Sequence, residues 1–315
     1  MNPSQAGPDI LVIKLGALGD FVLAAGPFAA IRRHHPTSRI TLLTTPPFAD
    51  FARAAPWFDA VWVDARPRLW NLPGVLRLRR LLRARPFGRV YDLQTSDRSS
   101  WYRRLLPGAV EWSGIAPGCS HPHANPRRDF MHTLERQAEQ LAMAGIASVE
   151  AADFSWVTAD TGRFGLTPPY VLLVPGGAAH RPAKRWPVTH YAALARFLAE
   201  RKIQPVILGS AQEGDLAATI RSDCPAALDL TGATGLFDIA ALARGARMAI
   251  GNDTGPMHLV AAAGCPSIVL FSEESDPALC APRGRVTILR RPSLDRLELE
   301  AVQDAIDRLG GKACD

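Results

Sequence analysis

Both halves of the chain repeat one pattern, in which a short run of apolar residues precedes a turn and then a segment of helical periodicity. The apolar runs of the first half are residues 9–15, 39–44, 60–63 and 90–94. Those of the second half are residues 170–175, 204–208, 228–231, 248–250 and 267–271. Strands that alternate with helices in this way form parallel sheets covered by helices. The pattern therefore predicts an α/β protein with two doubly wound parallel sheets.

A polar stretch with two glycines and two prolines, residues 157–169, separates the two series and is typical of a linker. We therefore expect an N-terminal Rossmann-like domain in residues 1–156 and a C-terminal Rossmann-like domain in residues 170–315, facing a central cleft. A chain of 315 residues is long enough for two such domains.

The segment AIGNDTGPMHLVAAAGCPSIVLF, residues 249–271, contains the most informative turn. It predicts a strand, a polar turn at 251–255, a helix that begins at Pro256, and a second strand. Asn, Asp and Thr cap helix N-termini, and proline is tolerated at the first helical position. The free backbone N–H groups of such a helix start can bind a phosphate. A structural cap is the alternative, but Asn252, Asp253, Thr254 and His258 form a denser polar set than a cap needs.

A second glycine turn, residues 16–20, follows the first predicted strand with the spacing G-x-x-G-D. This spacing differs from the dinucleotide-binding pattern G-x-G-x-x-G. Asp20 falls at the predicted start of a helix, where the helix dipole stabilises a carboxylate. A role as N-cap and a role in catalysis are therefore both open. Asp97 and Arg98 follow the strand at 90–94, where open α/β sheets bind their ligands.

The composition, with 47% hydrophobic and 21% charged residues, is typical of a soluble globular protein. The sequence has neither an apolar run long enough to span a membrane nor a recognisable signal peptide, so we expect a cytoplasmic protein. Five scattered cysteines without a C-x-x-C pair indicate reduced thiols. His121 and His123 lack further ligands at a recognisable spacing, so we expect no metal site.

The net charge of +6 arises entirely in the first half, where residues 1–155 hold 19 Lys and Arg against 13 Asp and Glu. Eleven arginines and two acids lie between Arg66 and Arg104. Such a field attracts anionic partners such as phosphorylated sugars, acidic lipid headgroups or nucleic acid. A solvated arginine-rich surface is the alternative. The basic amphipathic helix predicted at 72–85 is compatible with a peripheral membrane contact, although we favour an ordinary surface helix.

Four segments together resemble one known family: ILVIKLGALGDFVLAAGPFAAIRRHHP, AAHRPAKRWP, GSAQE and GNDTGPMHLVAAAGCPSIVLF. They are similar, in this order, to glycosyltransferase family 9, the ADP-heptose:lipopolysaccharide heptosyltransferases, and the resemblance covers nearly the whole chain. It implies the GT-B architecture, with the acceptor bound by the first domain and the nucleotide sugar by the second. It further implies inverting transfer of a heptose from ADP-heptose to a hydroxyl of the lipopolysaccharide inner core. No metal or other cofactor is implied, and the chain contains no D-x-D pair.

The resemblance assigns roles to individual residues. Asp20 matches the family's general base, which removes the acceptor proton. Lys184 matches the phosphate-binding lysine and, with the helix start at Thr254 and Gly255, would stabilise the departing ADP. We assign Asp253 to sugar hydroxyls, His258 to a phosphate and Glu213 to the ribose, while Ala178 and Ala179 leave phosphate contacts to backbone N–H groups. The other expected contacts are Gly176, Arg181 and Met257 for the donor and Gly19, Asp97 and Arg98 for the acceptor.

One segment departs from the family pattern: after Phe271 many members continue with glycine and a proline-containing turn, whereas this chain has residues 272–277, SEESDP. The transferred sugar is therefore open. Lys184 also has an alternative, in which it is an exposed lysine and a neighbouring arginine contacts the phosphate.

Rival functions are a GT-B transferase that uses another nucleotide sugar, a sugar-nucleotide 2-epimerase, and a non-catalytic binding module. Nucleic acid is the weakest candidate partner because few aromatic residues interleave with the arginines. We expect a nucleotide sugar and an anionic lipopolysaccharide acceptor as partners, at the cytoplasmic face of the inner membrane.

Overall fold

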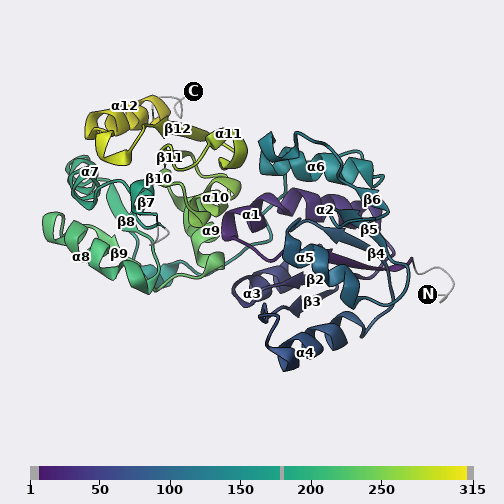
Figure 1. Cartoon of the computed structure of the whole chain (residues 1–315). Helices are drawn as coiled ribbons and strands as arrows, with labels where there is room; N and C mark the ends of the chain where they lie inside the picture. The colour runs from purple at the N-terminus through teal and green to yellow at the C-terminus, as the bar shows by residue number, and fades with distance from the viewer. Residues whose placement is uncertain (1–6, 178–180, 311–315) are drawn as a thin grey trace. The chain divides into compact units, whose positions relative to one another are not determined.

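The computed structural model describes residues 7–177 and 181–310 (Figure 1). The chain divides into two compact units, with the boundary between Trp156 and Val157. No helix in the described ranges is both long and apolar enough to cross a bilayer.

The first unit contains a six-stranded parallel sheet in the order β3-β2-β1-β4-β5-β6. This is the strand order 3-2-1-4-5-6 of a Rossmann fold. Its elements are β1 (Asp9–Ile13), α1 (Leu18–Leu23), α2 (Ala25–His34), β2 (Ile40–Thr44), α3 (Pro46–Ala54), β3 (Ala60–Val63), α4 (Leu72–Leu82), β4 (Phe87–Asp92), α5 (Asp97–Tyr102), β5 (Glu111–Gly114), β6 (His121–Pro122) and α6 (Thr133–Met143).

The second unit repeats this topology with a sheet in the order β12-β11-β10-β7-β8-β9, all parallel. Its elements are β7 (Tyr170–Val174), α7 (Val188–Glu200), β8 (Gln204–Ile207), α8 (Gly214–Asp223), β9 (Leu228–Asp229), α9 (Leu236–Gly245), β10 (Met248–Asn252), α10 (Gly255–Ala262), β11 (Ser267–Phe271), α11 (Pro277–Cys280), β12 (Val286–Arg290) and α12 (Leu299–Gly310). The prediction of two doubly wound parallel sheets is confirmed.

Each sheet lies between two layers of helices. In the first unit, α1 contacts α3 through the stacked rings of Phe21 and Phe48, whose centroids are 5.0 Å apart. Leu78 and Leu82 of α4 belong to a buried cluster that also contains Phe87. In the second unit, α7, α8 and α12 cover one face of the sheet and α9 and α10 the other (Figure 1). Central strands buried on both faces must be apolar throughout, which explains their continuous hydrophobic runs.

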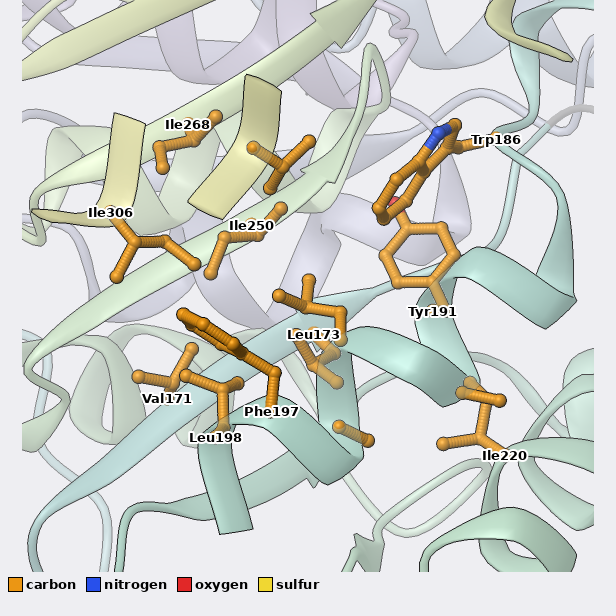
Figure 2. Close-up of a cluster of buried hydrophobic side chains, with 14 of the residues drawn as sticks. Val171, Leu173, Trp186, Tyr191, Phe197, Leu198, Ile220, Ile250, Ile268 and Ile306 are labelled. Atoms are coloured by element: carbon orange, nitrogen blue, oxygen red, sulfur yellow. The ribbon is translucent and has the colours of Figure 1, made fainter. Parts of the chain in front are cut away.

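A hydrophobic core of the second unit lies between its sheet and α7, α8 and α12, and Figure 2 shows some of its side chains. Val171 and Leu173 of β7 belong to this cluster together with Ile250 of β10 and Ile268 of β11. Each fully buried aliphatic side chain contributes about 1.5–3 kcal/mol to the free energy of unfolding. This core holds the central strands, and with them the turns at their carboxyl ends, in fixed positions.

Several element boundaries differ from the sequence-based prediction. The helix predicted to start at Asp20 is in fact two helices, α1 and α2, that meet at Ala24. Strand β10 extends to Asn252, so Gly251 and Asn252 belong to the strand and not to the turn. Strands β5, β6 and β12 and helix α12 were not predicted from the sequence. Residues 157–169 contact the second unit, where Arg163 forms an ion pair with Asp238 at 2.7 Å.

Candidate functional site

Three turns of the second unit lie side by side because their strands are neighbours in the order β10-β7-β8. They follow the carboxyl ends of β7 (residues 175–177), β8 (residues 208–213) and β10 (residues 253–254). The strand order reverses between β7 and β10, and open α/β sheets bind ligands at this reversal. All donor-binding residues expected from the sequence lie on these turns, on α10, or on the segment that follows β7.

Lys184 and Asp253 form an ion pair, with 2.7 Å between the lysine Nζ and the carboxylate Oδ2. Both side chains are largely buried, so solvent screens this pair less than a surface pair. The same carboxylate oxygen accepts a hydrogen bond from Ser275 Oγ at 2.6 Å. Lys184 is therefore not an exposed lysine, and the segment 272–277 that departs from the family pattern touches this pair.

Glu213 joins the turns after β7 and β8. Its Oε1 accepts a hydrogen bond from the Gly177 N–H at 3.2 Å, and its Oε2 accepts one from the Ser210 N–H at 2.6 Å. A Cβ atom at Gly176 would lie 1.9 Å from Glu213 Oε1, so any larger residue at this position would displace the Glu213 carboxylate from its present place. The predicted ribose contact of Glu213 stays a prediction, and the structure gives this carboxylate a bracing role as well.

Asn252 is a structural member of the polar set and not a ligand-facing one. Its side chain is fully buried. The side-chain oxygen accepts hydrogen bonds from the backbone N–H of Trp186 at 3.0 Å and from the Tyr191 hydroxyl at 3.1 Å. Its amide nitrogen donates to the carbonyls of Pro175 at 2.8 Å and Gly176 at 3.1 Å. Asn252 thus ties β10 to the turn after β7 and to the segment that carries Lys184.

The start of α10 carries no side-chain cap. Thr254 occupies the N-cap position in an extended conformation, and its side chain makes no capping hydrogen bond to a described residue. Its hydroxyl instead donates to the Asn252 carbonyl at 3.3 Å. Backbone N–H groups at such an uncapped start are suited to an anionic ligand.

The other predicted donor residues have different surroundings. Met257 and His258 are buried in α10, and Met257 packs against Gly251. Arg181 is exposed at the start of the turn that ends at Lys184. Arg185 donates a hydrogen bond to the Gly177 carbonyl and so also braces the turn after β7. Ala178 and Ala179 lie outside the described residues.

In the first unit, Asp20 lies in the first turn of α1, directly after the turn that follows β1. The N-cap position belongs to Ala17, so capping does not account for the carboxylate at Asp20. Gly19 and Asp20 are both partly exposed. The switch point of the first sheet lies between β1 and β4, so this turn occupies the ligand-binding position of its sheet.

Two buried groups that the sequence analysis missed lie at the same switch point. Lys14 donates a hydrogen bond from Nζ to the Leu93 carbonyl at 3.0 Å. Burial lowers the pKa of Lys14 to about 8, and attraction to Asp20 opposes this shift. Burial also raises the pKa of Asp92 to about 6, against hydrogen bonds from the backbone N–H groups that follow it. A lone lysine in the apolar run DILVIKL is the signal that could have identified Lys14.

Asp97 and Arg98, the residues after β4 that were predicted to bind the acceptor, have different surroundings. Asp97 is exposed and lines an open pocket of about 500 Å³ with Trp101 and Arg104. Arg98 donates to the Pro67 carbonyl at 3.1 Å and so tethers the segment before α4. The two residues are the first two of α5, their side chains have different surroundings, and their contacts with an acceptor stay a prediction.

His121 and His123 have separate acidic neighbours. His123 Nε2 lies 3.1 Å from Glu139, and His121 Nε2 lies 3.8 Å from Glu111. Within residues 7–177 and 181–310, no group of three or more His, Cys, Asp or Glu side chains is placed to hold a metal ion.

Taken separately, the two sites offer complementary chemistry. The second unit presents an ammonium group, an uncapped helix start and glycine turns that allow close backbone approach, which suits a diphosphate. The first unit presents a partly exposed carboxylate that acts electrostatically on buried Lys14. A carboxylate of this kind can accept a proton from a hydroxyl.

Solved structures with this arrangement define the class as GT-B. The structure of a family 9 glycosyl transferase from Veillonella parvula matches with a TM-score of 0.86 and 19% identity, over 98% of both chains. Escherichia coli heptosyltransferase WaaC with ADP matches with a TM-score of 0.77 and 20% identity, over 96% of this chain and 99% of that chain. At these identities the likeness establishes the fold.

The sequence then places the chain within that class. The family model described as "Glycosyltransferase family 9 (heptosyltransferase)" matches residues 75–295, so the chain belongs to this family, as the sequence motifs indicated. Lipooligosaccharide heptosyltransferase 2 of Haemophilus influenzae is 34% identical over 119 residues, which are 36% of this chain and 34% of that relative. The aligned part thus spans about a third of the relative's own length.

Proposed function

We propose that this protein transfers a heptose from ADP-heptose to a hydroxyl of a lipopolysaccharide core acceptor, with inversion at the anomeric carbon. Family membership supports glycosyl transfer. The name of the Haemophilus relative supports a lipooligosaccharide acceptor, and the ADP in the Escherichia coli neighbour supports an adenine nucleotide donor.

The observation that carries the proposal is the Lys184–Asp253 pair beside the uncapped start of α10. The ammonium group and the free N–H groups would meet the diphosphate and stabilise the charge that grows on ADP as it leaves. Asp253 keeps Lys184 in place before the donor binds. Its second carboxylate oxygen is then suited to accept hydrogen bonds from the sugar hydroxyls.

Asp20 is the proposed general base. A single displacement requires a group that takes the acceptor proton as the hydroxyl attacks, and a carboxylate within hydrogen-bond reach can do this. Lys14 is the proposed positioning residue, because its buried ammonium acts on both Asp20 and Asp92. Acceptor binding by the first unit and work at the cytoplasmic face of the inner membrane are parts of the same proposal.

The first test is calorimetric titration of the protein with ADP, UDP and GDP. We expect selective binding of ADP and at least tenfold weaker ADP binding by Lys184→Ala, since each lost charge-assisted contact costs about 1.5–3 kcal/mol. Lys202→Ala, at an exposed lysine of the same unit, is the matched control. A preference for UDP or GDP would exclude heptose transfer from ADP-heptose.

The second test is turnover of ADP-heptose with a lipid-anchored core acceptor. Asp20→Asn should abolish transfer while ADP binding stays intact. Conversion of a nucleotide sugar by the protein without any acceptor would instead favour an epimerase.

A further inference from the structure

Five of the eight exposed large apolar side chains among the described residues lie between Val63 and Leu76, around the start of α4. Trp70 is 78% exposed, and Leu69, Leu72 and Leu76 are between 46% and 64% exposed. We call these four residues the Trp70 patch. Only Leu78 and Leu82 of α4 are buried, so the helix attaches to its sheet by one narrow stripe.

The charge around the Trp70 patch has one sign. Residues 65–91 contain eight arginines, no lysine and no acid. Arg79 and Arg80 are three and four residues beyond Leu76, so they share its face of the helix. The carboxylate of Asp64, which precedes this stretch, is buried and accepts a hydrogen bond from the Tyr102 hydroxyl at 2.5 Å. It therefore does not neutralise the outer surface.

Several of these arginines are available to a partner. Arg77, Arg79 and Arg80 are exposed and form no ion pair within residues 7–177 and 181–310. Arg68 lies over the Trp70 ring at 5.2 Å, which places a cation beside the largest apolar group of the patch. Arg85 and Arg89, by contrast, are bound to Asp9 and Glu111.

We propose that the Trp70 patch and the surrounding arginines form a docking surface for an anionic lipid bilayer. A tryptophan and leucines that project from a helix start, with arginines on the same face, are what an interfacial helix presents to a membrane. The apolar groups enter the headgroup boundary, and the arginines contact the acidic headgroups. A soluble acidic polymer would use the arginines, and bases could stack on Trp70, but it would leave the three leucines largely in water. The proposal therefore takes up the membrane contact that the sequence analysis placed second to an ordinary surface helix.

The test is flotation of the full-length protein with vesicles, without donor or acceptor. We expect binding to vesicles of phosphatidylcholine and phosphatidylglycerol, weaker binding at high salt, and little binding to phosphatidylcholine alone. Trp70→Ser combined with Leu72→Ser should reduce binding at least about tenfold. Arg79→Gln combined with Arg80→Gln should reduce it by a similar factor.

Phe130→Ser is the matched control, because Phe130 is also 78% exposed but lies outside the patch. It should bind vesicles as the wild type does. Circular dichroism of each variant shows whether it is folded. Wild-type protein that does not bind the anionic vesicles, or that binds only single-stranded DNA, would overturn the proposal, as would an equal loss in Phe130→Ser. Since no sugar is transferred in this experiment, its failure would leave the proposed reaction untouched.

Discussion

Replacement of Asn252 by leucine tests whether the donor half of the site is held together by one buried amide. The substitution keeps the number and branching of the side-chain heavy atoms but removes all four hydrogen bonds of the amide. The Tyr191 hydroxyl retains the Val174 carbonyl at 3.3 Å as an acceptor. The Trp186 N–H and the carbonyls of Pro175 and Gly176 lose the partner that Asn252 provides.

Each buried polar group that loses its partner costs about 1–3 kcal/mol, so the sum for three groups is about 3–9 kcal/mol. This is a large share of the roughly 5–15 kcal/mol that stabilises a domain. At roughly 2–4 °C per kcal/mol for a unit of this size, the melting temperature should fall by at least about 6 °C. Urea unfolding followed by circular dichroism measures the free energy, and ADP titration measures the donor site. Binding should weaken because the segment that carries Lys184 is no longer tied to β10.

Asn71→Ala is the control for this experiment. Asn71 makes one exposed capping hydrogen bond, to the Gly74 N–H at 3.1 Å, and its loss should cost only about 1 kcal/mol. If Asn252→Leu were no less stable than Asn71→Ala, the reasoning about the buried amide would be refuted.

Three further predictions concern the groups around the two sites. Lys14→Met should lower kcat about tenfold without changing ADP affinity, because it removes a positioning charge beside Asp20; an unchanged kcat in a folded variant would exclude this role. The pKa of Asp92 is higher in the folded protein than in the unfolded chain, so its ionisation destabilises the fold as pH rises through about 6. Urea unfolding measures the free energy of unfolding of the wild type and of Asp92→Asn. Between about pH 8 and about pH 5, this free energy should rise by about 1–1.5 kcal/mol more in the wild type than in Asp92→Asn. No such rise would mean that Asp92 is not desolvated. Ser275→Ala should weaken ADP-heptose binding more than ADP binding, because Ser275 Oγ orients the Asp253 carboxylate; Ser222→Ala, at an exposed hydroxyl on α8, is its control.

Local sequence patterns were sufficient for the fold class, the two-sheet organisation and the family. Alternating apolar runs and helical segments are short-range signals, and central strands buried on both faces carry them strongly. Elements whose own sequence carries no strong apolar pattern were not predicted. Strands β5 (EWSG) and β6 (HP) contain a single large apolar residue, Trp112, so neither shows an apolar run. Helix α12 does carry an apolar face at Leu299, Val302 and Ile306, a signal that the sequence analysis did not use.

Only the tertiary structure decided which side chains meet. Lys184 and Asp253 are 69 residues apart, and they pair because β7 and β10 are neighbours in the sheet. Lys14 reaches the Leu93 carbonyl because β1 lies beside β4. A local period does not encode strand order, so these contacts, the structural role of Asn252 and the exposure of Trp70 could not be read from the chain. The sequence determined the kinds of groups at each turn, whereas the order of the strands determined which of them act together.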